Sequence, residues 1–186
     1  MREAPSNTDN IINSRDVIKR IEELDAERDD LVDDFVQVRD KHEEARIAVQ
    51  GAEDDKLLAV LHDKDIEKAQ GVLDKALELV DEVREDFEEA EAALKEWQEE
   101  YGDELKALKT LADEGADYSG NWSCGETLIH EDYFVEYVKG FVEDIGDFPR
   151  DLPAYVVIDW EAIAENIKVD YTEIDFDGTT FLIWNS

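Results

Sequence analysis

The chain of 186 residues is poor in the residue types from which catalytic and metal sites are usually built. It has one cysteine, Cys124, which excludes an internal disulfide framework, and its three histidines form no Cys/His cluster with structural zinc spacing. No run of eighteen apolar residues is present, and the polar start MREAPSNTDN leads into no apolar stretch. We therefore expect neither a signal peptide nor a membrane span, and we expect a cytoplasmic protein.

Basic residues are scarce relative to acidic ones. There are 19 Lys and Arg against 52 Asp and Glu, which gives a net charge of −33. Because such a charge repels phosphates, we expect no direct contact with DNA, RNA or an anionic membrane. Residues 113–186 hold 18 acids and only three bases, Lys139, Arg150 and Lys168. Halophilic solvation is an alternative, but the chain retains 11 Lys to 8 Arg, mostly in its first 112 residues.

The first 112 residues show the spacing of a coiled coil. Apolar or seam positions recur from Val17 to Val49 at alternating steps of four and three residues. The same steps recur from Leu73 to Tyr101. This is the 3.5-residue period of a coiled-coil seam, so we expect two long antiparallel helices.

Two positions of the first seam, Arg28 and His42, are polar. A polar seam residue can fix the register or the choice of partner. Alternatively, its stem packs while its polar tip stays in water, and we favour this second interpretation.

The expected ends of the two helices follow from capping residues and glycines. Ser14 is the expected N-cap of the first helix, and Gly51 supplies a left-handed stop before the acids that begin the second. Gly115 is expected to end the second helix. Helices of roughly 36 and 56 residues could not pair along their full lengths. The rest of the second helix would then be left to contact the C-terminal domain or another subunit, and we expect a homodimer.

The last part of the chain indicates a small α+β domain. Tyr155–Ile158 is a short apolar run that fits a strand or a helix entry. Asp177-Gly178 favours a type I′ turn, which matches the twist of the flanking strands. The expected helices are His130–Ile145, ended by Gly146, and Trp160–Val169, capped by Asp159; the expected hairpin strands are Tyr171–Phe176 and Thr179–Trp184.

The predicted fold class is therefore α+β, with a long antiparallel helical coiled coil followed by a small α+β domain that ends in a β-hairpin. The expected organisation is a flexible N-terminus at 1–13, a helical coiled-coil hairpin at 14–112, a linker at 113–126 and the acidic α+β domain at 127–186.

Candidate catalytic and metal sites are weak. The run from Glu173 to Gly178 imitates the start of a calcium-binding loop, but Trp184 occupies the position that needs a bidentate Glu, so the hairpin is favoured. Cys124 and His130 are six residues apart across a turn. No glycine-rich phosphate cradle, Gly-x-Ser-x-Gly elbow or His-Glu-x-x-His pair is present. We therefore expect no catalytic residue, no metal site and no cofactor.

Unneutralised acid in the C-terminal domain is the most informative chemical feature. Proteins hold DNA largely through Lys and Arg directed at phosphates, so carboxylates on consecutive helical turns can occupy the same basic groove. A solvated charged face is the alternative. The candidate partner-binding carboxylates are those of Glu131, Asp132, Glu136, Glu143, Asp144, Asp147, Asp159, Glu161, Glu165, Asp170, Glu173 and Asp175.

Several short motifs follow one another in the C-terminal third. An acidic and aromatic helix at Tyr133–Gly146 precedes Pro149-Arg150-Asp151-Leu152, then Ile158-Asp159-Trp160-Glu161-Ala162, then a hairpin. This order resembles the C-terminal domain of ArdA-type antirestriction proteins, and residues 159–178 also look like a domain of small phage proteins. The family consists of phage- or plasmid-borne DNA mimics that occupy the DNA groove of type I restriction–modification enzymes. The resemblance implies no catalytic residues.

Together these features predict a nonenzymatic, phage- or mobile-element-type protein that mimics DNA charge. Its expected partner is a basic DNA-binding protein, such as a restriction–modification enzyme, in the host cytoplasm. The alternative is a coiled-coil structural or adaptor protein that acts through protein contacts.

Overall fold

The computed structural model describes residues 4–62, 65–145, 153 and 156–185. They form a mostly helical fold with one antiparallel four-stranded sheet. The chain divides into two compact units. The hairpin unit is Asp25–Gly102, and the sheet unit combines Met1–Leu24 with Asp103–Ser186.

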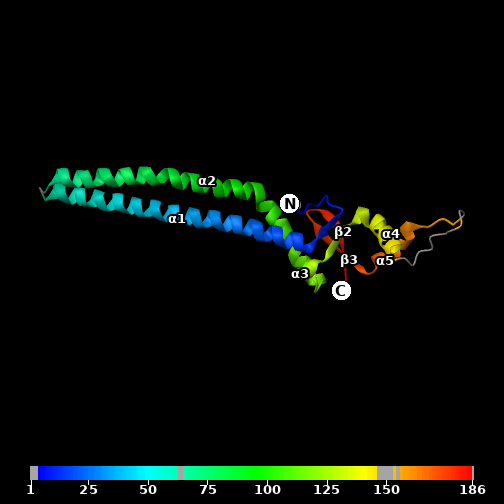
Figure 1. The fold of residues 1–186 in the computed structure, drawn as a ribbon. Coiled ribbons are helices and arrows are strands. Elements are labelled where there is room, and N and C mark those ends of the chain that lie inside the picture. Colours follow the sequence, from blue (N-terminus) through cyan, green and yellow to red (C-terminus); the bar gives the residue numbers. More distant parts are fainter. Residues whose placement is uncertain (1–3, 63–64, 146–152, 154–155, 186) are drawn as a thin grey trace. The chain divides into compact units, whose positions relative to one another are not determined.

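Two long helices, α1 (Ser14–Leu61) and α2 (Ile66–Tyr118), supply the hairpin unit. Within this unit they run side by side in opposite directions (Figure 1). The ring centroid of Phe87 on α2 lies 5.6 Å from the ring centroid of Phe35 and 5.0 Å from that of His42, both on α1. Near the end of the unit that holds Asp25 and Gly102, the indole N–H of Trp97 donates to Glu27 over 3.5 Å. The two helices are therefore joined by side-chain contacts along the unit.

The buried side chains of α1 recur at a regular spacing. Val38, Ala45, Ala52 and Ala59 are buried at steps of seven residues, while the side chains around them are largely exposed. A stripe of this kind places one side of the helix against a neighbour. The expected polar position His42 is half-buried and stacks on Phe87 with an interplanar angle of 12°.

The expected helix end at Gly51 is wrong, because α1 continues through it to Leu61. A side chain at Gly51 would meet nothing within 4 Å, so this glycine lies on the exposed side. Glycine in a helix interior costs about 1 kcal/mol. The free energy gained by burying the methyl groups of Ala52 and Ala59, about 0.8 kcal/mol for each, offsets this cost.

The two helices are consequently close in length, with 48 residues in α1 and 53 in α2. The expectation that the first covers only part of the second is wrong within the hairpin unit, where the helical segments 25–61 and 66–102 match. The helix lengths therefore give no support to the predicted homodimer.

The sheet unit contains strands in the order β1-β2-β4-β3, all antiparallel to their neighbours. The strands are β1 (Ile11–Asn13), β2 (Thr127–His130), β3 (Tyr171–Phe176) and β4 (Thr179–Trp184). Strand β1 lies in the segment that the sequence analysis assigned to a flexible N-terminus. Strand β2 includes His130, which the sequence analysis placed at the start of a helix.

The helix after β2 therefore begins later than predicted. His130 Nδ1 accepts the N–H of Asp132 over 3.1 Å and caps a short 3₁₀ turn, η1 (Glu131–Tyr133). Helix α4 (Phe134–Asp144) follows, and α5 (Trp160–Lys168) comes after it in the chain. Both helices pack on one face of the sheet.

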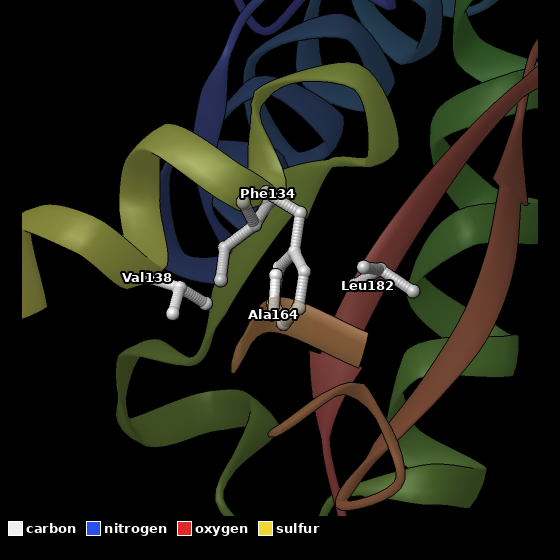
Figure 2. Close-up of a cluster of buried hydrophobic side chains, with 5 residues drawn as sticks. Phe134, Val138, Ala164 and Leu182 are labelled. Atoms are coloured by element: carbon white, nitrogen blue, oxygen red, sulfur yellow. The ribbon is translucent and has the colours of Figure 1, made fainter. Parts of the chain in front are cut away.

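The core of the sheet unit lies between these helices and the sheet. Phe134 and Val138 of α4 and Ala164 of α5 meet Leu182 of β4 and Ile129 of β2 (Figure 2). All five side chains are at most 3% exposed. The opposite face of the sheet is also covered, since it carries the fully buried side chains Leu128, Phe181 and Ile183.

The predicted C-terminal hairpin is confirmed residue by residue. Asp177 and Gly178 have φ angles of 50° and 79°, as a type I′ turn requires. Ile174 and Phe176 are buried, whereas the alternate residues Glu173 and Asp175 are exposed.

The predicted cap of α5 is confirmed as well. Asp159 accepts the N–H of Ala162 over 3.0 Å, and the helix extends to Lys168. Of the apolar run before it, Val156–Ile158 have no regular secondary structure. Gly146 and Tyr155 lie outside the described residues.

The segment predicted as a linker, 113–126, includes the end of α2 and the buried residues Ser119 and Trp122. Helix α2 continues through Gly115 to Tyr118, and the ring of Trp122 occupies the space beside this glycine. A Cβ on Gly115 would lie 2.1 Å from Trp122 Cζ3. The short helix α3 (Trp122–Gly125) follows.

Ser14 joins the start of α1 to this packed segment. Its hydroxyl donates to the carbonyl of Trp122 over 2.6 Å and accepts the N–H of Glu126 over 2.7 Å. The capping interaction expected of Ser14 is made instead by Asn13, whose side chain accepts the N–H of Arg15 over 3.0 Å.

Candidate partner-binding surface

Eleven of the twelve predicted partner-binding acids are described, and all eleven are exposed. Asp147 lies outside the described residues. Their positions follow the elements of the sheet unit: η1 holds Glu131 and Asp132, α4 holds Glu136, Glu143 and Asp144, Asp159 caps α5, α5 holds Glu161 and Glu165, and β3 with the residue before it holds Asp170, Glu173 and Asp175.

The exposure of these acids follows from helical and strand periodicity. On α4, Phe134 and Val138 occupy the buried side, so Glu136, Glu143 and Asp144 remain outside. On α5, Ala164 lies on the buried side, and the acids Glu161 and Glu165 are exposed to solvent. The acids of both helices therefore lie on the exposed side, which on α4 also carries Val135 and Phe141, 36% and 48% exposed.

Three of the predicted acids are occupied by the two lysines of this region. Lys168 Nζ lies 2.7 Å from Glu131 and 3.0 Å from Glu173. The hydrogen bond to Glu131 contributes most to raising the pKa of the Lys168 amine, and the hydrogen bond to Glu173 contributes next. Lys139 lies 3.5 Å from Glu136. The sequence did not reveal the lysine clamp, because Glu131, Lys168 and Glu173 come from three separate elements.

Two further acids stabilise the local backbone. Asp159 caps α5, and Asp175 accepts the N–H of Gly178 over 3.2 Å at the hairpin turn. Six predicted acids make no ion pair with a base in the described part of the chain: Asp132, Glu143, Asp144, Glu161, Glu165 and Asp170. These six are the carboxylates most available to an incoming basic group.

Sequence reasoning missed a second, denser acidic region on the hairpin unit. Residues 81–100 of α2 carry ten acids and two bases, and all ten acids are exposed. Both bases pair along the same helix: Arg84 lies 3.1 Å from Asp81, and Lys95 lies 3.7 Å from Glu99. Residues 25–40 of the facing helix add seven acids and two bases.

The charge density of this stretch approaches that of duplex DNA. Residues 25–40 and 81–100 together carry a net charge of −13. This charge lies along about 30 Å of the paired helices, which gives roughly one negative charge every 2.3 Å. Duplex DNA has one charge about every 1.7 Å of axis. The pairing of the two helices over equal lengths, which adds the charges of residues 25–40 to those of 81–100, was not predicted from the sequence.

The remaining chemistry of the described residues is sparse. No helix among them is long and apolar enough to cross a membrane. Within the same residues, no group of three His, Cys, Asp or Glu side chains converges in the manner of a metal site. The thiol of Cys124 is exposed and free. Burial, and then the neighbouring Tyr137, raise the pKa of the Tyr171 hydroxyl, which keeps this group neutral.

Comparison with known proteins adds no further assignment. No protein-family model, curated protein or solved structure matches the chain.

Proposed function

We propose that this protein is a nonenzymatic, antirestriction-like mimic of DNA charge. Its partner is a basic DNA-binding protein, such as a type I restriction–modification enzyme. The observation that carries the proposal is the exposed acid of the hairpin unit, at about one net charge per 2.3 Å of helix. The resemblance of the C-terminal motifs to ArdA-type proteins points to the same function.

The unpaired state of these carboxylates supports the proposal. Glu85, Asp86, Glu89, Glu96 and Glu100 on α2 make no ion pair with a base in the described part of the chain. A target that supplies Lys and Arg would therefore not have to break existing salt bridges. Long-range attraction between such surfaces accelerates association and weakens steeply with salt.

The six available acids of the sheet unit extend the same argument. They lie on a small fold whose core is closed by Phe134, Val138 and Leu182, so their backbone positions are fixed. A preorganised array loses less conformational entropy on binding than a flexible acidic tail would. This distinguishes the protein from a merely acidic polypeptide.

A second candidate is a coiled-coil adaptor that acts through protein contacts. Exposed apolar side chains near the connection between the two helices favour it: Leu57, Leu58, Leu61 and Ile66 are 41–68% exposed. Such a cluster is a common feature of protein interaction sites. An adaptor of this type would depend on apolar residues rather than on carboxylates, which makes the two candidates separable.

Charge-neutralising variants test the proposal. One variant carries Glu85→Gln, Asp86→Asn, Glu89→Gln, Glu96→Gln and Glu100→Gln in the dense part of α2. A matched control changes five exposed acids elsewhere on the hairpin: Glu44→Gln, Glu53→Gln, Asp55→Asn, Glu67→Gln and Glu78→Gln. Each is assayed for protection of DNA from a purified type I restriction–modification enzyme.

The first variant is expected to lose about tenfold or more in inhibitory affinity, and the control much less. Equal inhibition by both variants and the native chain would contradict DNA mimicry. A loss produced only by Leu57→Gln or Leu61→Gln would favour the adaptor.

A further inference from the structure

A groove with an apolar floor and an acidic rim on its α2 side lies between the two helices of the hairpin unit. Its volume is about 870 Å³. Val32 and Phe35 of α1 and Ala92 and Leu94 of α2 supply apolar surface, and Val32 remains 36% exposed. Apolar side chains placed together in an open depression are typical of a protein docking site.

Acidic residues line one side of this floor. Glu88, Glu91 and Glu99 line the groove on the α2 side. Glu88 and Glu99 make only long, exposed pairs within their own helix, at 3.8 Å to Arg84 and 3.7 Å to Lys95. Exposed pairs of this kind contribute little, so both carboxylates can accept a better-placed base.

The two bases that line the groove are held by local acids. Arg28 lies 3.1 Å from Asp25 and 2.8 Å from Asp29, and Lys95 pairs with Glu99. The hairpin unit as a whole contains 27 acids and 10 bases. A second copy of this chain would bring the same negative charge to the groove, so the electrostatics disfavour self-association there.

The length of the groove indicates the kind of segment that fits. Its lining residues on α2 extend from Glu88 to Glu99, which corresponds to about 16 Å, or three helical turns. An amphipathic helix of that length presents apolar residues at i, i+3, i+4 and i+7 to such a floor. Lys and Arg beside that stripe would meet the acidic rim.

We propose that this groove binds a basic amphipathic helix of a partner protein, with its apolar stripe on Val32, Phe35 and Leu94 and its basic flanks on Glu88, Glu91 and Glu99. This inference goes beyond DNA mimicry, because it assigns an apolar anchor to an interaction that charge alone would leave nonspecific. It also does not require the partner to bind DNA.

The test uses a synthetic fourteen-residue peptide of Leu and Lys, with Leu at helical spacing, and a scrambled peptide of the same composition. Their binding to the full chain is measured by fluorescence anisotropy at low and high salt. Val32→Gln removes apolar surface from the groove without changing charge. Val72→Gln, at a 51% exposed position of the same hairpin that does not line the groove, is the matched control.

The amphipathic peptide is expected to bind more tightly than the scrambled one and to keep this advantage at high salt. Val32→Gln should weaken its binding by about tenfold, and Val72→Gln should leave it unchanged. Circular dichroism of both variants checks that the helices are intact, and Ala92→Gln, at an exposed groove position, provides a second variant with the same expected direction.

Several results would overturn the inference. Equal binding of the two peptides, or equal effects of Val32→Gln and Val72→Gln, would reduce the interaction to nonspecific charge. A change in sedimentation of the chain alone on Val32→Gln would identify a second copy as the occupant. Loss of DNA mimicry in the restriction assay would leave this test unaffected, because no DNA-binding protein takes part in it.

Discussion

The hairpin unit and the sheet unit carry almost the same net charge, −17 and −16, yet they use their acids differently. In the sheet unit, Glu131 and Glu173 hold Lys168, Asp159 caps a helix, and Asp175 supports a turn. In the hairpin unit, the acids at 81–100 pair with the few bases along their own helix or with none in the described part of the chain. Acid content alone therefore does not separate acids that stabilise the fold from acids available to an incoming base, whereas the partners of each carboxylate do.

The largest expected difference between substitutions concerns the buried alanines of the hairpin unit. Ala52→Asp places a charge at a position that is 5% exposed and is expected to destabilise the hairpin by about 3 kcal/mol. Ala48→Asp, at an exposed position of the same helix, should have an effect below about 0.5 kcal/mol. Urea unfolding followed by circular dichroism measures both. Equal effects would mean that the helix does not continue through Gly51 with Ala52 on its buried side.

The sheet unit has its own sensitive position at Gly115. Gly115→Ala brings a methyl group against the Trp122 ring and is expected to cost about 2 kcal/mol, since this ring lies in a packed segment. Gly51→Ala, where nothing lies within 4 Å, should instead stabilise α1 by roughly 0.8 kcal/mol. Thermal unfolding distinguishes them. If both substitutions stabilise the protein, Trp122 does not pack on Gly115.

The lysine clamp of the sheet unit gives a smaller and pH-dependent effect. Lys168→Met is expected to destabilise the unit by about 1 kcal/mol at neutral pH, because Glu131 and Glu173 lose their shared cation. Lys139→Met, which removes a single exposed pair, should have less than half this effect.

The pKa of Lys168 is raised in the folded state. Its contribution is therefore complete below the unfolded pKa of about 10.4 and is lost as pH rises through the higher folded pKa. Urea titrations at pH 7 and at successive pH values above 10 measure this dependence. A difference between native chain and Lys168→Met that stayed constant over this range would contradict the clamp.

Locally encoded features could be predicted from the sequence, and features that depend on distant residues could not. Asp177-Gly178 fixes a turn through its own backbone preferences, and Asp159 caps α5 through a residue three positions away. Both were predicted correctly. Strands β1 and β2 are short and find their partners far along the chain, so no local pattern distinguished them.

The two glycine predictions failed for a related reason. Gly51 and Gly115 both look like helix ends when read locally. The burial of Ala52 and Ala59 continues the first helix, and the ring of Trp122 gives Gly115 a packing role inside the second. The predicted acids are exposed as expected, but their use by Lys168 or by backbone N–H groups depends on how separate elements meet.

The most direct test of the central claim is displacement of a bound partner by DNA. The full chain is immobilised, incubated with host lysate at low salt, and eluted first with duplex DNA and then with salt. The account predicts that duplex DNA releases a DNA-binding protein, and that the affinity of this protein falls steeply between 50 and 200 mM salt, as counterion release requires. A partner that stays bound in excess duplex DNA and is insensitive to salt would contradict DNA mimicry.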